Sequence, residues 1–210
     1  MTLYIASTSP GKVKEFRESA LSYSVIVKPV PGIRGLPACV EDGETFEANA
    51  RKKALHYSRF VSGLLMADDS GICVDALEGA PGVHSARFAG PSADDDENNR
   101  LLLRRLRKVR PAGANQMVGH GTIKRSAHYI CVIALAERGR ILTTTKGRSN
   151  GLIMETPRGS GGFGYDPLFY YPPLGKSFAE LTPETKFGVS HRGMAFRKLL
   201  AYLSRNLKSK

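Results

Sequence analysis

The sequence has few cysteines, and they are scattered. Only three occur among 210 residues, Cys39, Cys73 and Cys131, and none forms a C-x-x-C spacing. Their number is odd, and each lies among apolar neighbours, so a network of disulfides is not expected. We predict three buried free thiols, which are typical of a protein from a reducing compartment.

Long apolar runs and several common catalytic patterns are also missing. No run could span a bilayer, and residues 1–6 have neither the basic flank nor the length of a signal peptide. We therefore expect a cytoplasmic protein that does not bind membranes. The P-loop spacing G-x-x-x-x-G-K is absent, as are a local Ser-His-Asp arrangement and metal-ligand spacing among His84, His120 and His128.

Positive charge is in excess. The chain has 31 basic and 19 acidic residues, a formal net charge of +12. Such a charge favours polyanionic partners, which include nucleic acid, a membrane surface and small polyphosphates. A protein that binds nucleic acid is expected to interleave aromatic with basic residues. That pattern is missing, so we expect no stable nucleic-acid complex.

Strand-like and helix-like segments alternate along the chain. Strands are expected at 2–7, 24–30, 64–67, 72–74, 129–136, 140–146 and 152–154. Helices are expected from Ser9, Thr45 and Ser92, each acting as an N-cap, and again from 182 and 190. The first is expected to carry an apolar stripe of Val13, Phe16, Ala20 and Leu21, and the last one of Phe196, Leu199, Leu200, Leu203 and Leu207. A glycine-containing connector is expected at 111–121. The interleaving and the chain length predict one α/β domain, residues 1–210, on a mixed sheet.

Two adjacent carboxylates, Asp68 and Asp69, follow an apolar strand and precede a Ser-Gly pair that indicates a turn. Buried carboxylates need a compensating positive charge, and a divalent metal commonly supplies it in phosphate chemistry. Glu41 could complete a carboxylate cage for Mg²⁺, and Lys53 could reach the same place. The alternatives are an ordinary polar strand end, with Lys53 on a solvated basic helix face.

Two predicted helices begin with positively charged side chains. Lys12 ends a strand-to-helix loop whose N–H groups can hold phosphate, and His191 and Arg192 begin the last helix, with Lys186 nearby. Cations at a helix N-terminus oppose the macrodipole, and a bound phosphate would relieve that conflict. Alternatively, Lys12 extends into solvent. Arg192 has donors and no acceptor, which suits a purine keto oxygen and not an exocyclic amine.

A third segment places an aromatic ring among glycines. Phe163 lies between Gly162 and Gly164, where the backbone can approach a ligand closely. Phe163 could stack on a base and Asp166 could accept from a ring N–H. The alternative is a hairpin turn with core aromatics. The acidic run 94–97 is interpreted as compensation of a helix dipole, because basic residues end the same helix.

These segments together resemble the inosine triphosphate pyrophosphatase family, also called Ham1-like. The blocks that carry the resemblance are Ser7 to Lys12, Thr45-Phe46 with Asn49 and Lys53, Ala67 to Gly71, Gly79 to Gly82, Ser85 to Arg87, Gly161 to Pro167 and Ser190 to Gly193. It spans almost the whole chain. It implies an elongated α/β fold on a long mixed twisted sheet, with two lobes and a central cleft. It also implies a homodimer that requires Mg²⁺.

The implied activity is hydrolysis of the deaminated nucleotides ITP, dITP and XTP to the monophosphate and pyrophosphate. A related Maf-like pyrophosphatase is the alternative, and the block Ser190-His-Arg-Gly193 argues against it. The resemblance assigns Asp69 as catalytic carboxylate and metal ligand and Glu41 as the other metal carboxylate. Asp68 could hold a second metal ion or position the first.

The resemblance also assigns the substrate contacts. They are Ser7, Thr8, Ser9, Pro10, Gly11, Lys12, Lys53, Ser70, Phe163, Gly164, Tyr165, Asp166, Lys186, His191 and Arg192. Ser9 stands where the family usually has asparagine. Serine retains the capping role but lacks the amide's reach and its two donors. The connector at 109–125 is longer than in most bacterial members.

Overall fold

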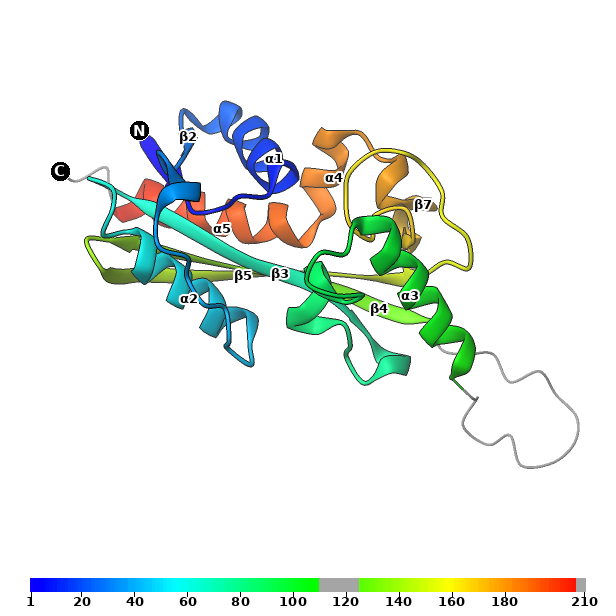
Figure 1. Cartoon of the computed structure of the whole chain (residues 1–210). Helices are drawn as coiled ribbons and strands as arrows, with labels where there is room; N and C mark the ends of the chain where they lie inside the picture. Colours follow the sequence, from blue (N-terminus) through cyan, green and yellow to red (C-terminus); the bar gives the residue numbers. More distant parts are fainter. Residues whose placement is uncertain (110–124, 207–210) are drawn as a thin grey trace, which may run out of the picture. The chain divides into compact units, whose positions relative to one another are not determined.

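A computed structural model describes residues 1–109 and 125–206 (Figure 1). The predicted connector at 111–121 lies outside these ranges. The chain forms two compact units. The first unit consists of Met1–Ser70, Ile130–Arg148 and Pro183–Lys210, and the second of Gly71–Tyr129 and Ser149–Thr182.

Seven strands form one mixed sheet in the order β2-β1-β3-β4-β5-β6-β7. The strands are β1 (Thr2–Ile5), β2 (Ile26–Pro29), β3 (Leu65–Val74), β4 (Ser126–Glu137), β5 (Arg140–Ile153), β6 (Phe169–Tyr171) and β7 (Lys176–Ser177). β1 pairs in parallel with β2 and β3, whereas β6 pairs antiparallel with β5 and β7. The predicted α/β fold on a mixed sheet is confirmed.

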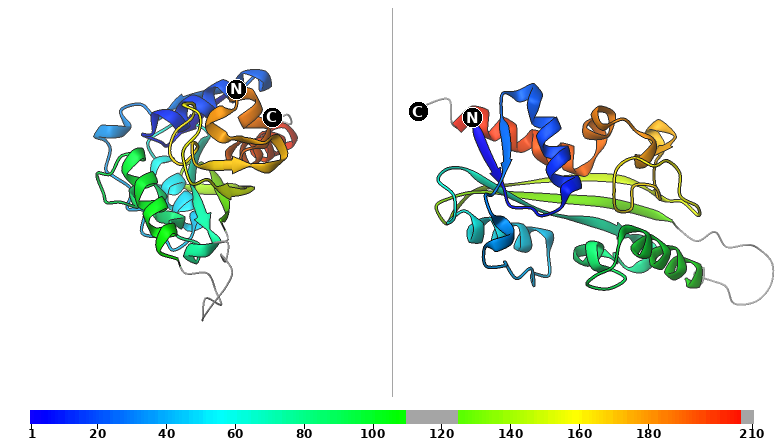
Figure 2. Two further views of the ribbon diagram at one scale, coloured as in Figure 1. Left: turned by 90° about the vertical axis from the view of Figure 1, so that its right-hand side faces the viewer. Right: turned by 45° about the horizontal axis from the view of Figure 1, so that its top comes forward.

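The α-helices of the described residues are α1 (Pro10–Ala20), α2 (Phe46–Tyr57), α3 (Asp95–Lys108), α4 (Pro183–Val189) and α5 (His191–Asn206). In the first unit, α1 and α5 lie on one face of the sheet and α2 lies on the other (Figures 1 and 2). None of the helices in the described ranges is both long and apolar enough to cross a membrane.

The core of the first unit joins the strands to α1 and α5. Its fully buried members include Leu3, Ile5, Phe16, Cys131, Ile133, Phe196 and Leu199. The rings of Phe16 and Phe196 meet edge to face, with centroids 5.1 Å apart. The predicted apolar stripe of α5 is therefore confirmed over its described part. Leu21, which was expected on the stripe of α1, is 79% exposed because α1 ends at Ala20.

Two predicted strand breaks are wrong. Apart from Leu64, the segments 64–67 and 72–74 belong to the continuous strand β3. Apart from Met154, the segments 140–146 and 152–154 both belong to β5. Glycines in β5 permit close approach instead of turns. A Cβ at Gly147 would overlap the carbonyl oxygen of His191, and a Cβ at Gly151 would overlap that of Tyr170.

Three further local predictions are corrected. The third helix is capped by Asp94 and not by Ser92, because Asp94 and Glu97 form a capping box. All three cysteines are free thiols, but only Cys131 is buried. Cys39 and Cys73 are partly exposed. By contrast, Ser9 and Thr45 cap α1 and α2 as predicted.

Candidate active site

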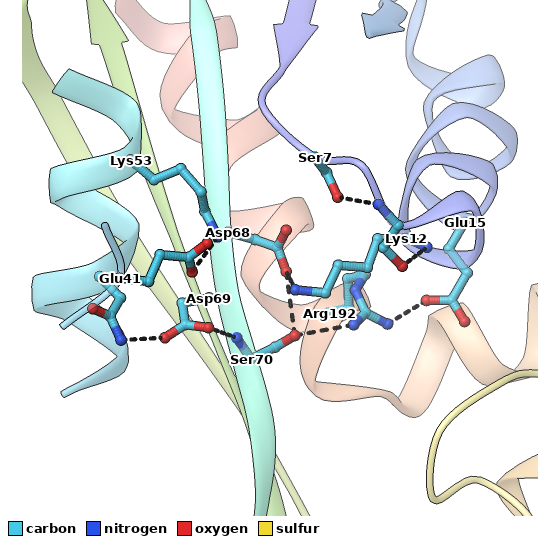
Figure 3. Close-up of polar contacts among 11 residues, drawn as sticks. Ser7, Lys12, Glu15, Glu41, Lys53, Asp68, Asp69, Ser70 and Arg192 are labelled. Carbon is cyan, nitrogen blue, oxygen red and sulfur yellow. Dashed lines mark hydrogen bonds and ion pairs between the residues drawn. The ribbon is translucent and has the colours of Figure 1, made fainter. Parts of the chain in front are cut away.

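Asp68 and Asp69 lie in the middle of β3, and the strand directs them to opposite faces. Successive side chains of a strand alternate in direction. Asp68 therefore shares a face with Ser70, whose Oγ donates to Asp68 Oδ2 at 3.2 Å. Asp69 lies on the other face, where Asn49 Nδ2 of α2 donates to Asp69 Oδ2 at 3.0 Å (Figure 3). Two neighbouring carboxylates thus have different surroundings.

Lys12 reaches Asp68 from the first turn of α1. Its Nζ lies 2.9 Å from Asp68 Oδ2, and its side chain is only 18% exposed, so the solvent alternative is wrong. The loop before it is held by serines: Ser9 Oγ accepts from the Lys12 N–H, and the Ser9 N–H donates to Ser7 Oγ at 3.3 Å. The first turn of α1 contains no acidic residue. Asp68 supplies the negative charge that this helix start lacks.

The two aspartates also differ in pKa. Burial would raise the pKa of Asp68, but the positive charges of Lys12, Arg192 and Lys53 outweigh it and lower the pKa to about 2. Burial raises the pKa of Asp69 above its usual value, and Lys53 and Lys12 oppose this only in part. Asp69 is therefore the stronger base of the two.

Helix α2 presents Asn49 and Lys53 on the same face, because they are four residues apart. Lys53 Nζ lies 2.7 Å from Glu41 Oε2, and its side chain is 12% exposed. Burial would lower the pKa of Lys53, but Asp68 and Glu41 raise it, so the ammonium stays charged. Lys53 is thus part of the carboxylate cluster and does not belong to a solvated basic face.

Glu15 connects three helices of the first unit and was not recognised from the sequence. It accepts from Lys186 Nζ of α4 at 2.5 Å and from Arg192 Nη1 of α5 at 2.5 Å. Arg192 Nη2 donates in turn to Ser70 Oγ at 3.1 Å (Figure 3). Burial would raise the pKa of Glu15, but Arg192 and Lys186 lower it below its usual value.

His191 does not add a second cation to the start of α5. Burial, together with the positive charges of Arg192 and Lys186, lowers the pKa of His191 well below its usual value. The ring is therefore neutral at pH 7, and the expectation of two cations at this helix start is corrected to one. Glu15 compensates that one, Arg192, without any bound phosphate.

The segment from Phe163 to Asp166 lies in the second unit, where it is held by one internal side-chain bond and by contacts with other segments of that unit. Asp166 Oδ2 accepts from the Phe163 N–H at 3.0 Å, and Asp166 Oδ1 lies 3.5 Å from the hydroxyl of Tyr129. Tyr165 is buried, and its hydroxyl donates to the carbonyl of Ser85 at 2.8 Å. Phe163 is partly exposed. All other predicted site residues lie in the first unit.

The carboxylates in β3 and beside α2 offer oxygen ligands for a divalent metal. Among residues 1–109 and 125–206, no three His, Cys, Asp or Glu side chains are already grouped to hold a metal ion. However, Asp68 Oδ1 is buried and has no hydrogen-bond partner among the described residues. Carboxylate oxygens of this kind are the ligands that Mg²⁺ prefers. The residues therefore fit a hard cation.

Similarity to known proteins identifies the family. The model of the Ham1 family matches residues 3–202. The chain belongs to the Ham1 family. This Ham1-family chain is 43% identical over 212 residues to a dITP/XTP pyrophosphatase of Acidobacterium capsulatum, with 97% of the chain and 98% of the relative covered. It is 40% identical to a dITP/XTP pyrophosphatase of a Thermoanaerobacter species, over 100% of both.

Solved structures of other Ham1-family proteins share the fold. A HAM1 protein from Coxiella burnetii has a TM-score of 0.82 at 35% identity, with 98% of this chain and 99% of that one covered. A nucleoside triphosphatase, or dITP/XTP pyrophosphatase, from Mycobacterium abscessus has a TM-score of 0.69 at 36% identity, covering 95% and 99%.

Proposed function

We propose that this chain hydrolyses the deaminated purine nucleotides ITP, dITP and XTP to the monophosphate and pyrophosphate. The observation that carries the proposal is the pair of buried carboxylates in β3, Asp68 and Asp69, with Lys12 2.9 Å from the first and Lys53 buried close to both. The names of the relatives, dITP/XTP pyrophosphatases, support it. We also propose that residues 1–210 act as a single catalytic domain.

The charge balance of the site calls for an added cation. Lys12 and Lys53 are already paired with Asp68 and Glu41, whereas a triphosphate brings several more negative charges. We assign the added cation to Mg²⁺, held by Glu41 and Asp69. Asp68, which faces the other side of β3, would hold a second ion or position the first. When bound, such an ion neutralises phosphate charge and lowers the pKa of a bound water.

The side chains of the site then have separate roles. Asp69 takes a proton from the water that attacks the α-phosphorus, and the bond from that phosphorus to the bridging oxygen breaks as pyrophosphate leaves. Asp69 suits this step better than Asp68, because the positive charges of Lys12, Arg192 and Lys53 lower the pKa of Asp68 to about 2. Lys12 and Lys53 stabilise charge on the phosphates. The loop from Ser7 to Lys12 and Ser70 contact the substrate.

The remaining predicted residues would recognise the base. Phe163 would stack on it, with Gly164, Tyr165 and Asp166 lining the same loop, and Lys186, His191 and Arg192 would supply further contacts. Arg192 donors suit an oxygen at the six-position, whereas adenine presents an amine there. A site built on such hydrogen bonds can reject the wrong base by about 10⁴-fold.

We further propose a cytoplasmic homodimer. The homodimer is proposed on the family resemblance. The cytoplasmic location is supported by the three free thiols, which are typical of proteins from a reducing compartment.

The test is a panel of nucleoside triphosphates with Mg²⁺, in which pyrophosphate and orthophosphate are measured separately. We expect pyrophosphate as the direct product with ITP, dITP and XTP, and little turnover of ATP. Asp69→Asn should lower turnover by about 10²–10⁴-fold, and the matched control Asp42→Asn, in an exposed loop, should not. Orthophosphate as the direct product, or a normal rate for Asp69→Asn, would contradict the proposal.

A further inference from the structure

Helix α3 binds both the N–H and the carbonyl of Gly164, in the loop after Gly159. Asp95 Oδ2 accepts from the Gly164 N–H at 2.6 Å, and Asn99 Nδ2 donates to the Gly164 carbonyl at 3.0 Å. Asp95 and Asn99 are four residues apart, so they project from the same face of α3. All three residues belong to the second unit.

The loop needs support at this glycine. Gly164 has φ +64°, in the left-handed region, and the neighbouring Gly162 has φ +72°. On the N-terminal side, the Gly161 N–H donates to the Ala179 carbonyl at 3.0 Å. Between these anchors lies Phe163, whose own N–H is held by Asp166. The direction of the Phe163 ring therefore depends on how the Gly164 peptide is oriented.

We propose that Asp95 and Asn99 are positioning residues for the nucleobase-binding loop. This inference rests on the proposed function, which places Phe163 to Asp166 against the base. By fixing the N–H and the carbonyl of Gly164, α3 pre-orients the Phe163 ring and the loop backbone. The base then binds without first ordering the loop, which lowers KM. No substrate phosphate or attacking water is involved, so kcat should change little.

A competing explanation for Asp95 is dipole compensation, because it lies in the acidic first turn of α3. Three variants separate the two. Asp95→Ala removes both the charge and the acceptor, whereas Asp95→Asn removes the charge and keeps an acceptor oxygen. Asp96→Ala removes a charge from the same turn at a residue whose contact is an exposed pair with Arg100.

Asn99→Ala tests the second contact. The amide oxygen of Asn99 is buried without a hydrogen-bond partner among the described residues, and its amide nitrogen donates to the Gly164 carbonyl. Asn99→Ala leaves the acceptor of the Gly164 N–H in place. Faster exchange of that N–H in this variant would therefore report a looser loop and not a deleted bond.

The experiment combines two measurements on the full chain. The two bonds from Asp95 and Asn99 to Gly164 are called the clamp below. Amide hydrogen exchange of segment 160–166 without substrate tests the clamp alone, and steady-state kinetics with dITP and Mg²⁺ test its effect on base binding. We expect Asp95→Ala and Asn99→Ala to accelerate exchange at Gly164 and to raise KM about tenfold, with kcat within about twofold of wild type. Asp95→Asn and Asp96→Ala should resemble wild type in both.

Each contrary outcome has a distinct meaning. Unchanged exchange in Asp95→Ala and Asn99→Ala overturns the clamp. Faster exchange with an unchanged KM overturns its role in base binding. Equal effects of Asp95→Ala and Asp96→Ala would show that Asp95 acts by compensating the helix dipole and not through Gly164. If wild type releases no pyrophosphate from dITP, the proposed function and the base-binding role fail, and the exchange data still decide whether α3 clamps the loop.

Discussion

Glu15 is the residue whose replacement tests the site most directly. Glu15→Gln keeps the shape of the side chain and removes the negative charge that lies 2.5 Å from both Lys186 Nζ and Arg192 Nη1. The side chains of Lys186 and Arg192 are only 7% and 5% exposed. Both cations would therefore lose their ion pair with Glu15 in a place that water hardly reaches.

The expected loss of stability can be bounded. Removing one partner of a buried ion pair costs about 3–5 kcal/mol. Glu15 is itself 24% exposed, and Arg192 keeps its bond to Ser70, so we reduce the expected loss to about 2–3 kcal/mol. For a chain of this size that corresponds to a fall in melting temperature of about 4–12 °C.

Thermal and urea unfolding followed by circular dichroism would measure this loss. The matched control is Glu18→Gln on the same helix, because Glu18 pairs with Lys14 at 3.9 Å and both side chains are largely exposed. That pair should be worth less than about 0.5 kcal/mol.

The pH dependence gives the prediction a second test. The folded state lowers the pKa of Glu15 from its usual 4.5, so its charge stabilises the fold fully above pH 4.5. That stabilisation is lost as the pH falls through the lower folded pKa. The difference between wild type and Glu15→Gln should therefore shrink below pH 4.5. A loss under about 1 kcal/mol at pH 7, or a difference that acid leaves unchanged, would refute the reasoning.

Two other substitutions test neighbouring parts of the site. Arg192→Ala should erode the preference for ITP over ATP by about tenfold or more, measured as a ratio of kcat/KM values, and an unchanged ratio would remove Arg192 from base recognition. Gly147→Ala should destabilise the protein by at least about 1–3 kcal/mol in urea unfolding, because its Cβ would overlap the backbone of α5. The control Gly188→Ala has open space around its Cβ and should not destabilise.

Local sequence signals predicted much of the fold. Caps at Ser9 and Thr45 and the apolar stripe of α5 depend on residues a few positions apart, so a single sequence contains the information. The same signals failed at two glycines inside strands. Gly71 suggested a turn and Gly147 lay between two separate strand predictions, yet both lie inside continuous strands. What packs against a glycine is a property of the folded chain.

The candidate site was also predicted only in part, because local signals reveal some of its residues and not others. Asp68, Asp69 and Lys12 were recognised because adjacent carboxylates and a cation at a helix start conflict with local electrostatics. Lys53 was named because the helix after Glu41 could bring it to the same carboxylates. Glu15 conflicts with no local electrostatic rule, since acidic residues are common on the exposed face of a helix. Its partner Arg192 lies 177 residues away in the sequence. The sequence explained Asp95 by compensation of the helix dipole alone. Its contact with Gly164, 69 residues away, could not be seen there.

The sequence by itself determined which chemical groups are present and which helices and strands carry them. Only the tertiary structure decided how those groups are paired. Alternation along β3 sends Asp68 toward Lys12 and Asp69 toward Asn49, so two identical side chains acquire opposite shifts in pKa. Burial and neighbouring charge depend on segments that meet only after folding. The family resemblance already assigned Asp69 as the base, but the physical difference between the two aspartates needed the fold.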